Sequence, residues 1–196
     1  MILVYALALS VVVGWLRGGR FRHWPDNALR GLALPVLAFL LEAAFGWFDS
    51  ALDVPTVYWL APAVLTEYAL LAAFLIRNRH TRGMAALGAG TLCNLLAMLT
   101  HGFAMPVSPV IHRYEALAGF VTRIDSGELA EYVLVGWDSP LWWLGDTIPL
   151  PAPPGLASIG DFFMAAGLFD DGEIVPMKLV SSKLPNGKTR KTLVLV

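Results

Sequence analysis

The chain has 196 residues, of which 57% are hydrophobic and 15% are charged, and its mean hydropathy is +0.62. Soluble domains are usually about 45–50% apolar and about 25% charged, so this composition excludes an ordinary water-soluble domain. The net charge of −1 argues against nucleic-acid binding, and the single cysteine, Cys93, excludes an intramolecular disulfide. We therefore expect an all-α, multi-pass integral membrane protein.

Five apolar stretches follow one another along the chain. Residues 2–16 come first and lack the cleavage pattern of a signal peptide, so we expect a retained span. Residues 31–48, 57–76 and 84–103 follow, and the last two have the length that a helix needs to cross about 30 Å of hydrocarbon. Residues 156–169 form a weaker fifth span, because 14 residues cover only about 21 Å as a helix.

The basic residues predict the orientation of these spans. The loops after the first and third spans hold seven arginines, and the tail, residues 170–196, holds five lysines and arginines. These make twelve of the fourteen basic residues, whereas the loop after the second span carries only acids. Because cytoplasmic loops favour Lys and Arg, we expect the N-terminus outside and the C-terminus inside. The bundle, residues 1–169, then precedes a cytoplasmic tail.

The long outer segment, residues 104–155, carries an amphipathic pattern. Four apolar residues share one helical face: Leu117, Phe120, Val121 and Ile124. Asp125 and Glu128 then have capping-box spacing before a second apolar run at residues 129–133. We expect two short helices, which either lie on the outer membrane surface or pack over the bundle. In the tail, Asn186-Gly187 predicts the turn of a β-hairpin.

Several polar residues lie within the predicted spans, where an ionised group is costly unless it is paired or hydrated. Glu42 and Glu67 are candidates to line a transport path, or to be protonated and to bond a neighbouring helix. Asn94 is expected to form hydrogen bonds between helices. His101 ends the fourth span, and no second His or Cys has metal-ligand spacing, so we predict neither a metal site nor a cofactor.

The two aspartates near the fifth span, Asp146 and Asp161, flank a proline-rich hinge. The prolines prevent a continuous helix here, so the chain must turn after Asp146 and re-enter the membrane before Asp161. Ser158 is positioned to cap the last helix, with Asp161 in its first turn. Structural roles of this kind explain each aspartate separately. They do not explain why both lie at one predicted depth on the outer side.

Four motifs resemble an uncharacterised family of bacterial membrane proteins with about five spans. They are LRGGR, HGFAMPVS, WLGDTIPLP and SIGDFFMAAG, and the resemblance covers residue 1 to about residue 169. In that family Asn often stands where this chain has His101. The family has no established activity, so the resemblance implies only a location in the inner (plasma) membrane.

A second resemblance is to lipoprotein signal peptidase, an intramembrane aspartyl protease. HGFAMPVS, LGD and SIGDFF occur in the order of that family's substrate strand and two catalytic aspartates. The resemblance implies that Asp146 and Asp161 form a dyad. It also implies that residues on the substrate strand face the substrate: His101, Gly102, Met105 and Ser108. The chain departs from that family in lacking its asparagines and in having five predicted spans.

These observations leave three functional hypotheses. The first is a non-catalytic component, either an accessory subunit of a larger membrane complex or a lipid or small-molecule binder, in which Trp142 and Trp143 contact the interface. The second is a di-aspartate hydrolase that acts on a lipid-linked or membrane-peptide substrate. The third is a small transporter that uses Glu42 and Glu67, which the absence of inverted repeats makes less attractive. In each of them the bilayer is the principal partner.

Overall fold

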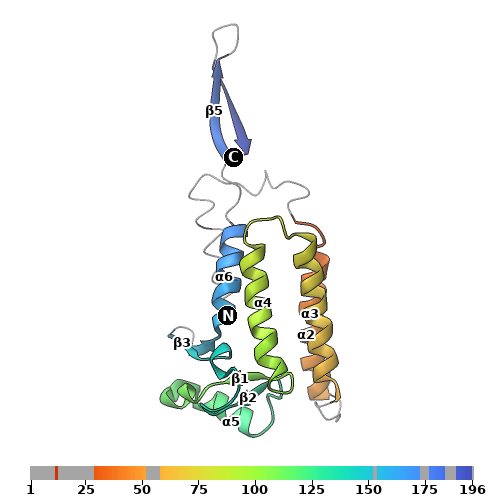
Figure 1. Ribbon diagram of the computed structural model, residues 1–196, viewed down its shortest axis with the longest axis vertical. Helices are drawn as coiled ribbons and strands as arrows, with labels where there is room; N and C mark the ends of the chain where they lie inside the picture. Colours follow the sequence, from red (N-terminus) through yellow and green to blue (C-terminus); the bar gives the residue numbers. More distant parts are fainter. Residues whose placement is uncertain are drawn as a thin grey trace.

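The computed structural model describes residues 12, 29–51, 58–151, 154–172, 177–183 and 189–195. Four helices run alongside one another: α2 (Ala33–Ala51), α3 (Leu60–Arg77), α4 (Met84–Leu99) and α6 (Ile159–Gly172). Figure 1 shows α2 beside α3 and α4 beside α6, with shorter elements gathered at one end of the helices. The described part of the chain is therefore mostly helical.

These helices correspond to four of the five predicted spans, and the first, residues 2–16, lies outside the described residues apart from Val12. Within the described ranges, α3 is the one helix that is both long and apolar enough to cross a membrane. The apolar parts of α4 and α6 are shorter. The last helix begins at Ile159 rather than at residue 156, because the preceding residues form a strand.

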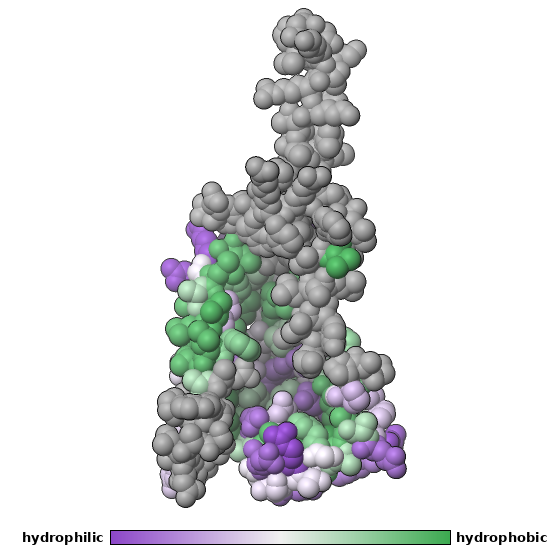
Figure 2. All heavy atoms as spheres, turned by 180° about the vertical axis from the view of Figure 1, so that it is seen from behind, coloured by the Kyte–Doolittle hydropathy of each residue, from purple (hydrophilic) through white to green (hydrophobic). Residues whose placement is uncertain are grey.

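The surface of the helices is apolar. Large hydrophobic side chains of α2 and α3 are exposed, including Phe39 at 67% and Ile76 at 62%. Figure 2 shows hydrophobic side chains over the helices and hydrophilic ones gathered over the end that carries the shorter elements. An apolar band of this kind is what a lipid environment would cover.

The shorter elements connect α4 to α6, and we call residues 100–158 the connecting subdomain. Its elements are β1 (Met105–Val107), the 3-10 helices η3 (Pro109–Arg113), η4 (Glu115–Leu117) and η5 (Trp142–Leu144), α5 (Ala118–Asp125), β2 (Tyr132–Leu134), β3 (Ile148–Pro151) and β4 (Pro154–Ala157). It has a small core of its own, formed by Val107, Ile111, Leu117 and Ile124. Phe120 packs edge-on against Tyr132 across this core, with ring centroids 5.1 Å apart.

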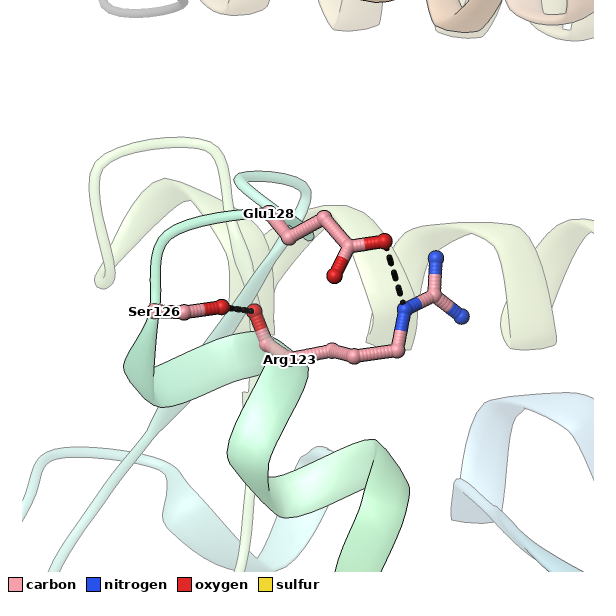
Figure 3. Close-up of polar contacts among 3 residues, drawn as sticks. All are labelled: Arg123, Ser126 and Glu128. Atoms are coloured by element: carbon pink, nitrogen blue, oxygen red, sulfur yellow. Dashed lines mark hydrogen bonds and ion pairs between the residues drawn. The ribbon is translucent and has the colours of Figure 1, made fainter.

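The first predicted amphipathic helix is confirmed as α5, but the second is wrong. Residues 132–134 form β2, which pairs in parallel with β1. Asp125 ends α5 instead of capping a new helix, and Glu128 forms an ion pair with Arg123 at 2.9 Å (Figure 3). Ser126 Oγ donates to the Arg123 carbonyl in the same turn. Pairing with β1 replaces the helix that the local pattern suggested.

Two hairpins complete the fold. Strands β3 and β4 pair in antiparallel fashion, with Ile148 opposite Ala157, and they lie immediately before α6. Beyond α6, β5 (Met177–Lys183) pairs with β6 (Thr189–Leu195), which confirms the hairpin predicted in the tail. Its predicted turn, Asn186-Gly187, lies outside the described residues.

Candidate functional site

The start of α6 is fixed by a reciprocal pair of hydrogen bonds. The Asp161 N–H donates to Ser158 Oγ at 2.9 Å, and the Ser158 N–H donates to Asp161 Oδ2 at 3.0 Å. Ser158 is fully buried, so its hydroxyl and amide need these partners. Such a pair satisfies two N–H groups that a helix start would otherwise leave unpaired. The predicted capping role of Ser158 is therefore confirmed, and Asp161 lies in the first turn.

Asn94 of α4 ties this helix start to the neighbouring helix. Its Nδ2 donates to Asp161 Oδ1 at 3.1 Å, and its Oδ1 accepts a bond from Ser158 Oγ at 2.9 Å. Asn94 is only 7% exposed. The prediction that Asn94 bonds between helices is thus confirmed, and both oxygens of Asp161 are held.

Glycine makes this contact between α4 and α6 possible. A Cβ at Gly160 would overlap the side chain of Asn94 and lie 2.7 Å from the Gly90 carbonyl oxygen. A Cβ at Gly90 would lie 2.8 Å from the Met164 amide nitrogen. The two backbones therefore approach so closely that a methyl group at either position forces them apart. The glycine of the SIGD motif is what lets Asn94 reach Asp161.

Asp146 is held through its backbone. Its N–H donates to the Pro106 carbonyl at 2.8 Å, and its own carbonyl accepts a bond from the Ser108 N–H at 3.1 Å. The preceding Gly145 lies against Pro106, where a side chain would not fit. Asp146 thus joins the edge of β1 as a parallel bridge to Val107. Among the residues that the structure describes, no group forms a hydrogen bond with its carboxyl, so this carboxyl is not a cap.

The β3–β4 hairpin brings Asp146 back to the start of α6. Asp146 lies just before β3, Ser158 lies just after β4, and the Thr147 N–H donates to the Ala157 carbonyl at 3.2 Å. Burial, and then the negative charge of Asp161, raise the pKa of Asp146 from 3.8 to about 7. The hinge thus folds so that the two aspartates interact electrostatically. They differ in kind, because Asp161 has hydrogen-bond partners whereas the Asp146 carboxyl has none within the described part of the chain.

Two further polar atoms in the connecting subdomain are buried without a hydrogen-bond partner in the described structure, namely Ser108 Oγ and His101 Nε2. Ser108 is fully buried and bonds Asp146 through its backbone, so its hydroxyl belongs to the neighbourhood of the aspartates. His101 Nδ1 lies 2.9 Å from the Ala97 carbonyl oxygen, which makes Nδ1 the protonated nitrogen.

The other predicted site residues are spread more widely. Gly102 has a φ of +66° in the turn after α4, and half-buried Met105 begins β1. Trp142 packs edge-on against Trp137 at 4.8 Å, while Trp143 is 48% exposed. Trp142 and Trp143 both lie in η5, which ends immediately before Gly145. They belong to the surface beside the site.

The two glutamates lie elsewhere in the fold. Glu67 is half-buried in α3, and Glu42 lies in α2 with its side chain outside the described residues. Neither helix carries the aspartates. In the described ranges no three His, Cys, Asp or Glu residues gather in a way that could hold a metal ion.

A cleft that the sequence did not predict lies along the hairpin. Its volume is about 400 Å³, and its lining is mostly apolar: Tyr114, Ala116, Leu117, Pro149, Leu150, Pro154 and Gly155. The prolines of the hinge, which the sequence indicated only as helix breakers, form one wall. Pro149, which lines the cleft, lies in β3 three residues after Asp146.

Comparison with known proteins identifies a family but no activity. Neither a curated protein nor a solved structure matches the chain, so the resemblance to lipoprotein signal peptidase gains no support. A family of unknown function, DUF5317, matches residues 26–170. This range includes α2, α3, α4, all but the last two residues of α6 and the whole connecting subdomain, with both aspartates. The chain therefore belongs to the family of unknown function DUF5317.

Proposed function

We propose that this protein is a multi-pass protein of the bacterial inner (plasma) membrane with a non-catalytic ligand site on its outer face. The membrane placement is supported by the composition, by the length and apolar character of α3, and by the exposed apolar side chains of α2 and α3. The alternation of basic and acidic loops supports an outer location for the connecting subdomain.

The ligand proposed for this site is the amine headgroup of a lipid. The observation that carries the proposal is the carboxyl of Asp146, which accepts no hydrogen bond within the described ranges. The backbone of Asp146 is fixed by β1, and its carboxyl interacts electrostatically with Asp161. Asp146 is half-buried, and a partly buried carboxylate without a hydrogen bond is stabilised by a charged N–H donor. The apolar cleft of about 400 Å³ along the hairpin that follows Asp146 is suited to part of an acyl chain.

A non-catalytic role suits the way in which Asp161 is held. In a di-aspartate hydrolase one carboxylate takes a proton from water while the other acid gives a proton to the substrate, and the two exchange these states during a cycle. Here both oxygens of Asp161 are committed to Asn94 and Ser158, which support the start of α6. A change of protonation at Asp161 would disturb that helix start.

The hydrolase nevertheless stands as the second candidate, because the raised pKa of Asp146 suits a general acid or base near neutral pH. Hydrolysis would add water across an amide or ester bond: the carboxylate takes the proton of the attacking water, and a proton passes to the leaving group. The two candidates can be distinguished because hydrolysis releases cleavage products and binding does not.

The test measures lipid binding by the purified full-length protein. Short-chain phosphatidylethanolamine, which has N–H donors, is titrated against phosphatidylcholine, which has none. We expect a preference for the ethanolamine lipid that falls by about tenfold or more in Asp146→Asn, since hydrogen bonds to charged groups contribute about 1.5–3 kcal/mol.

The control variant is Asp138→Asn, which removes an exposed acid from the same segment. Equal binding of both lipids, or an equal loss in the two variants, would refute the proposed site. Incubation with total membrane lipids and proteins, followed by mass spectrometry, tests the second candidate. Cleavage products that depend on Asp146 would replace the binding proposal with hydrolysis.

A further inference from the structure

A second cleft lies at the end of the helices opposite the connecting subdomain. Its volume is about 520 Å³, and it is lined by Arg30, Gly31, Ile76, Arg77, Arg79 and His80. Three arginines thus surround one cleft, and in the described ranges none of them forms an ion pair with an acid. Arg79 Nε donates to His80 Nε2 at 3.1 Å within the cleft. A cluster of guanidinium groups without an acidic partner attracts a phosphate, to which Arg donates in bidentate fashion.

The cleft is held in shape by a buried asparagine. Asn78, only 4% exposed, accepts a bond from the Arg30 N–H at 2.7 Å and donates to the Arg30 carbonyl at 2.9 Å. The same amide donates to the Phe74 carbonyl at 2.8 Å. The chain that enters α2 is thereby fastened to the end of α3, and Arg30 and Arg77 are brought to one cleft although they lie 47 positions apart.

The apolar surface continues directly into this cluster. Ile76 lines the cleft and is 62% exposed, and it belongs to the helix that is long enough to cross a membrane. The 18 residues of α3 span about 27 Å, so Arg77 at its end would lie near the depth of lipid phosphates. A molecule that fits both surfaces carries an anionic head and an apolar tail.

We infer that this cleft binds the headgroup phosphate of an anionic phospholipid in the cytoplasmic leaflet. The inference rests on the membrane placement proposed above and does not depend on the aspartate site. In the sequence, these basic residues indicated only how the spans are oriented in the membrane. The inference gives them a second role, as the binding site for a lipid headgroup. Basic pockets beside membrane helices on the cytoplasmic side are suited to such headgroups.

The test uses phosphatidylglycerol as the anionic probe and phosphatidylcholine as the neutral one, titrated into the detergent-solubilised full-length protein and measured by native mass spectrometry. We expect a preference for phosphatidylglycerol that falls about fivefold in Arg79→Gln. The conservative Arg79→Lys keeps the charge and is expected to retain most of the preference. Arg82→Gln is the matched control, because Arg82 belongs to the same exposed segment but does not line the cleft.

Three results would overturn the inference. Equal losses in Arg79→Gln and Arg82→Gln would mean diffuse charge attraction without a site. Full displacement of the lipid by inorganic phosphate at matched ionic strength would mean a site for soluble anions. Equal binding of both lipids by the wild type would mean no site at all. Flotation of the reconstituted protein with liposomes tests membrane placement separately, and its failure would overturn both proposals.

Discussion

Replacing Asp146 by Asn tests the placement of this carboxyl without changing its shape. The folded protein holds the group where burial and the charge of Asp161 disfavour ionisation, whereas the amide carries no charge at any pH. The substitution should therefore stabilise the protein at alkaline pH, although it alters a residue of the candidate site. Stabilisation by loss of a functional group is expected where a site carries a destabilised charge.

The magnitude follows from the pKa of Asp146, which is about 7 in the folded chain against 3.8 for the ordinary group. The folded state binds this proton more tightly than the unfolded state, so its contribution to stability is fully present below pH 4. That contribution is lost as pH rises through 7. This difference in pKa corresponds to on the order of 4 kcal/mol in the free energy of unfolding, as an upper limit.

The assay is a series of thermal unfolding curves from pH 4 to pH 8 for wild type and Asp146→Asn in the same detergent. We expect equal midpoints near pH 4 and a growing advantage of the variant up to about pH 7, with no further change above. Asp138→Asn, at an exposed position, should show no such trend. A difference in unfolding midpoint between wild type and Asp146→Asn that stays constant from pH 4 to pH 8 would refute the raised pKa of Asp146. A variant that is less stable than wild type at pH 8 would refute it as well.

Three further substitutions test the surroundings of the site. Asp161→Asn should lower the free energy of unfolding by about 1 kcal/mol because it weakens the start of α6. Because it also removes the neighbouring negative charge, it should lower the pH at which the ionisation of Asp146 begins to destabilise the protein. Gly160→Ala should cost about 1–3 kcal/mol, whereas Gly119→Ala, where a Cβ meets nothing within 4 Å, should be neutral or stabilising in thermal unfolding. Glu128→Gln breaks only an exposed ion pair and should change the free energy of unfolding by less than about 1 kcal/mol; a larger loss would mean that this pair organises the subdomain.

The features predicted from sequence are those with local causes. The cap of the last helix was predictable because the capping residue and its partner, Ser158 and Asp161, lie three positions apart. The hydrogen bonding of Asn94 between helices was predictable because an amide in an apolar helix needs a partner on another helix. The interaction of the aspartates was raised as a question, since the prolines indicated a turn without giving its geometry.

The features that were missed depend on contacts between distant segments. Residues 129–133 have a helical apolar pattern, but Val133 pairs with Pro106 in a parallel ladder, and tertiary pairing overrides local preference. The backbone bonds between Asp146 and β1 are of the same kind, because they join residues about 40 positions apart. The cleft beneath the hairpin also has no local signal, because η4 and the two strands build it together.

The measurement that tests the proposed function most directly is the pH dependence of phosphatidylethanolamine binding. Its ammonium group stays charged between pH 5 and pH 8, so the change in affinity reports the ionisation of Asp146. With a pKa of about 7, we predict that affinity rises about tenfold per pH unit up to pH 7 and then levels off, and that this dependence is absent in Asp146→Asn. Affinity that is independent of pH in the wild type would contradict a site centred on this carboxyl.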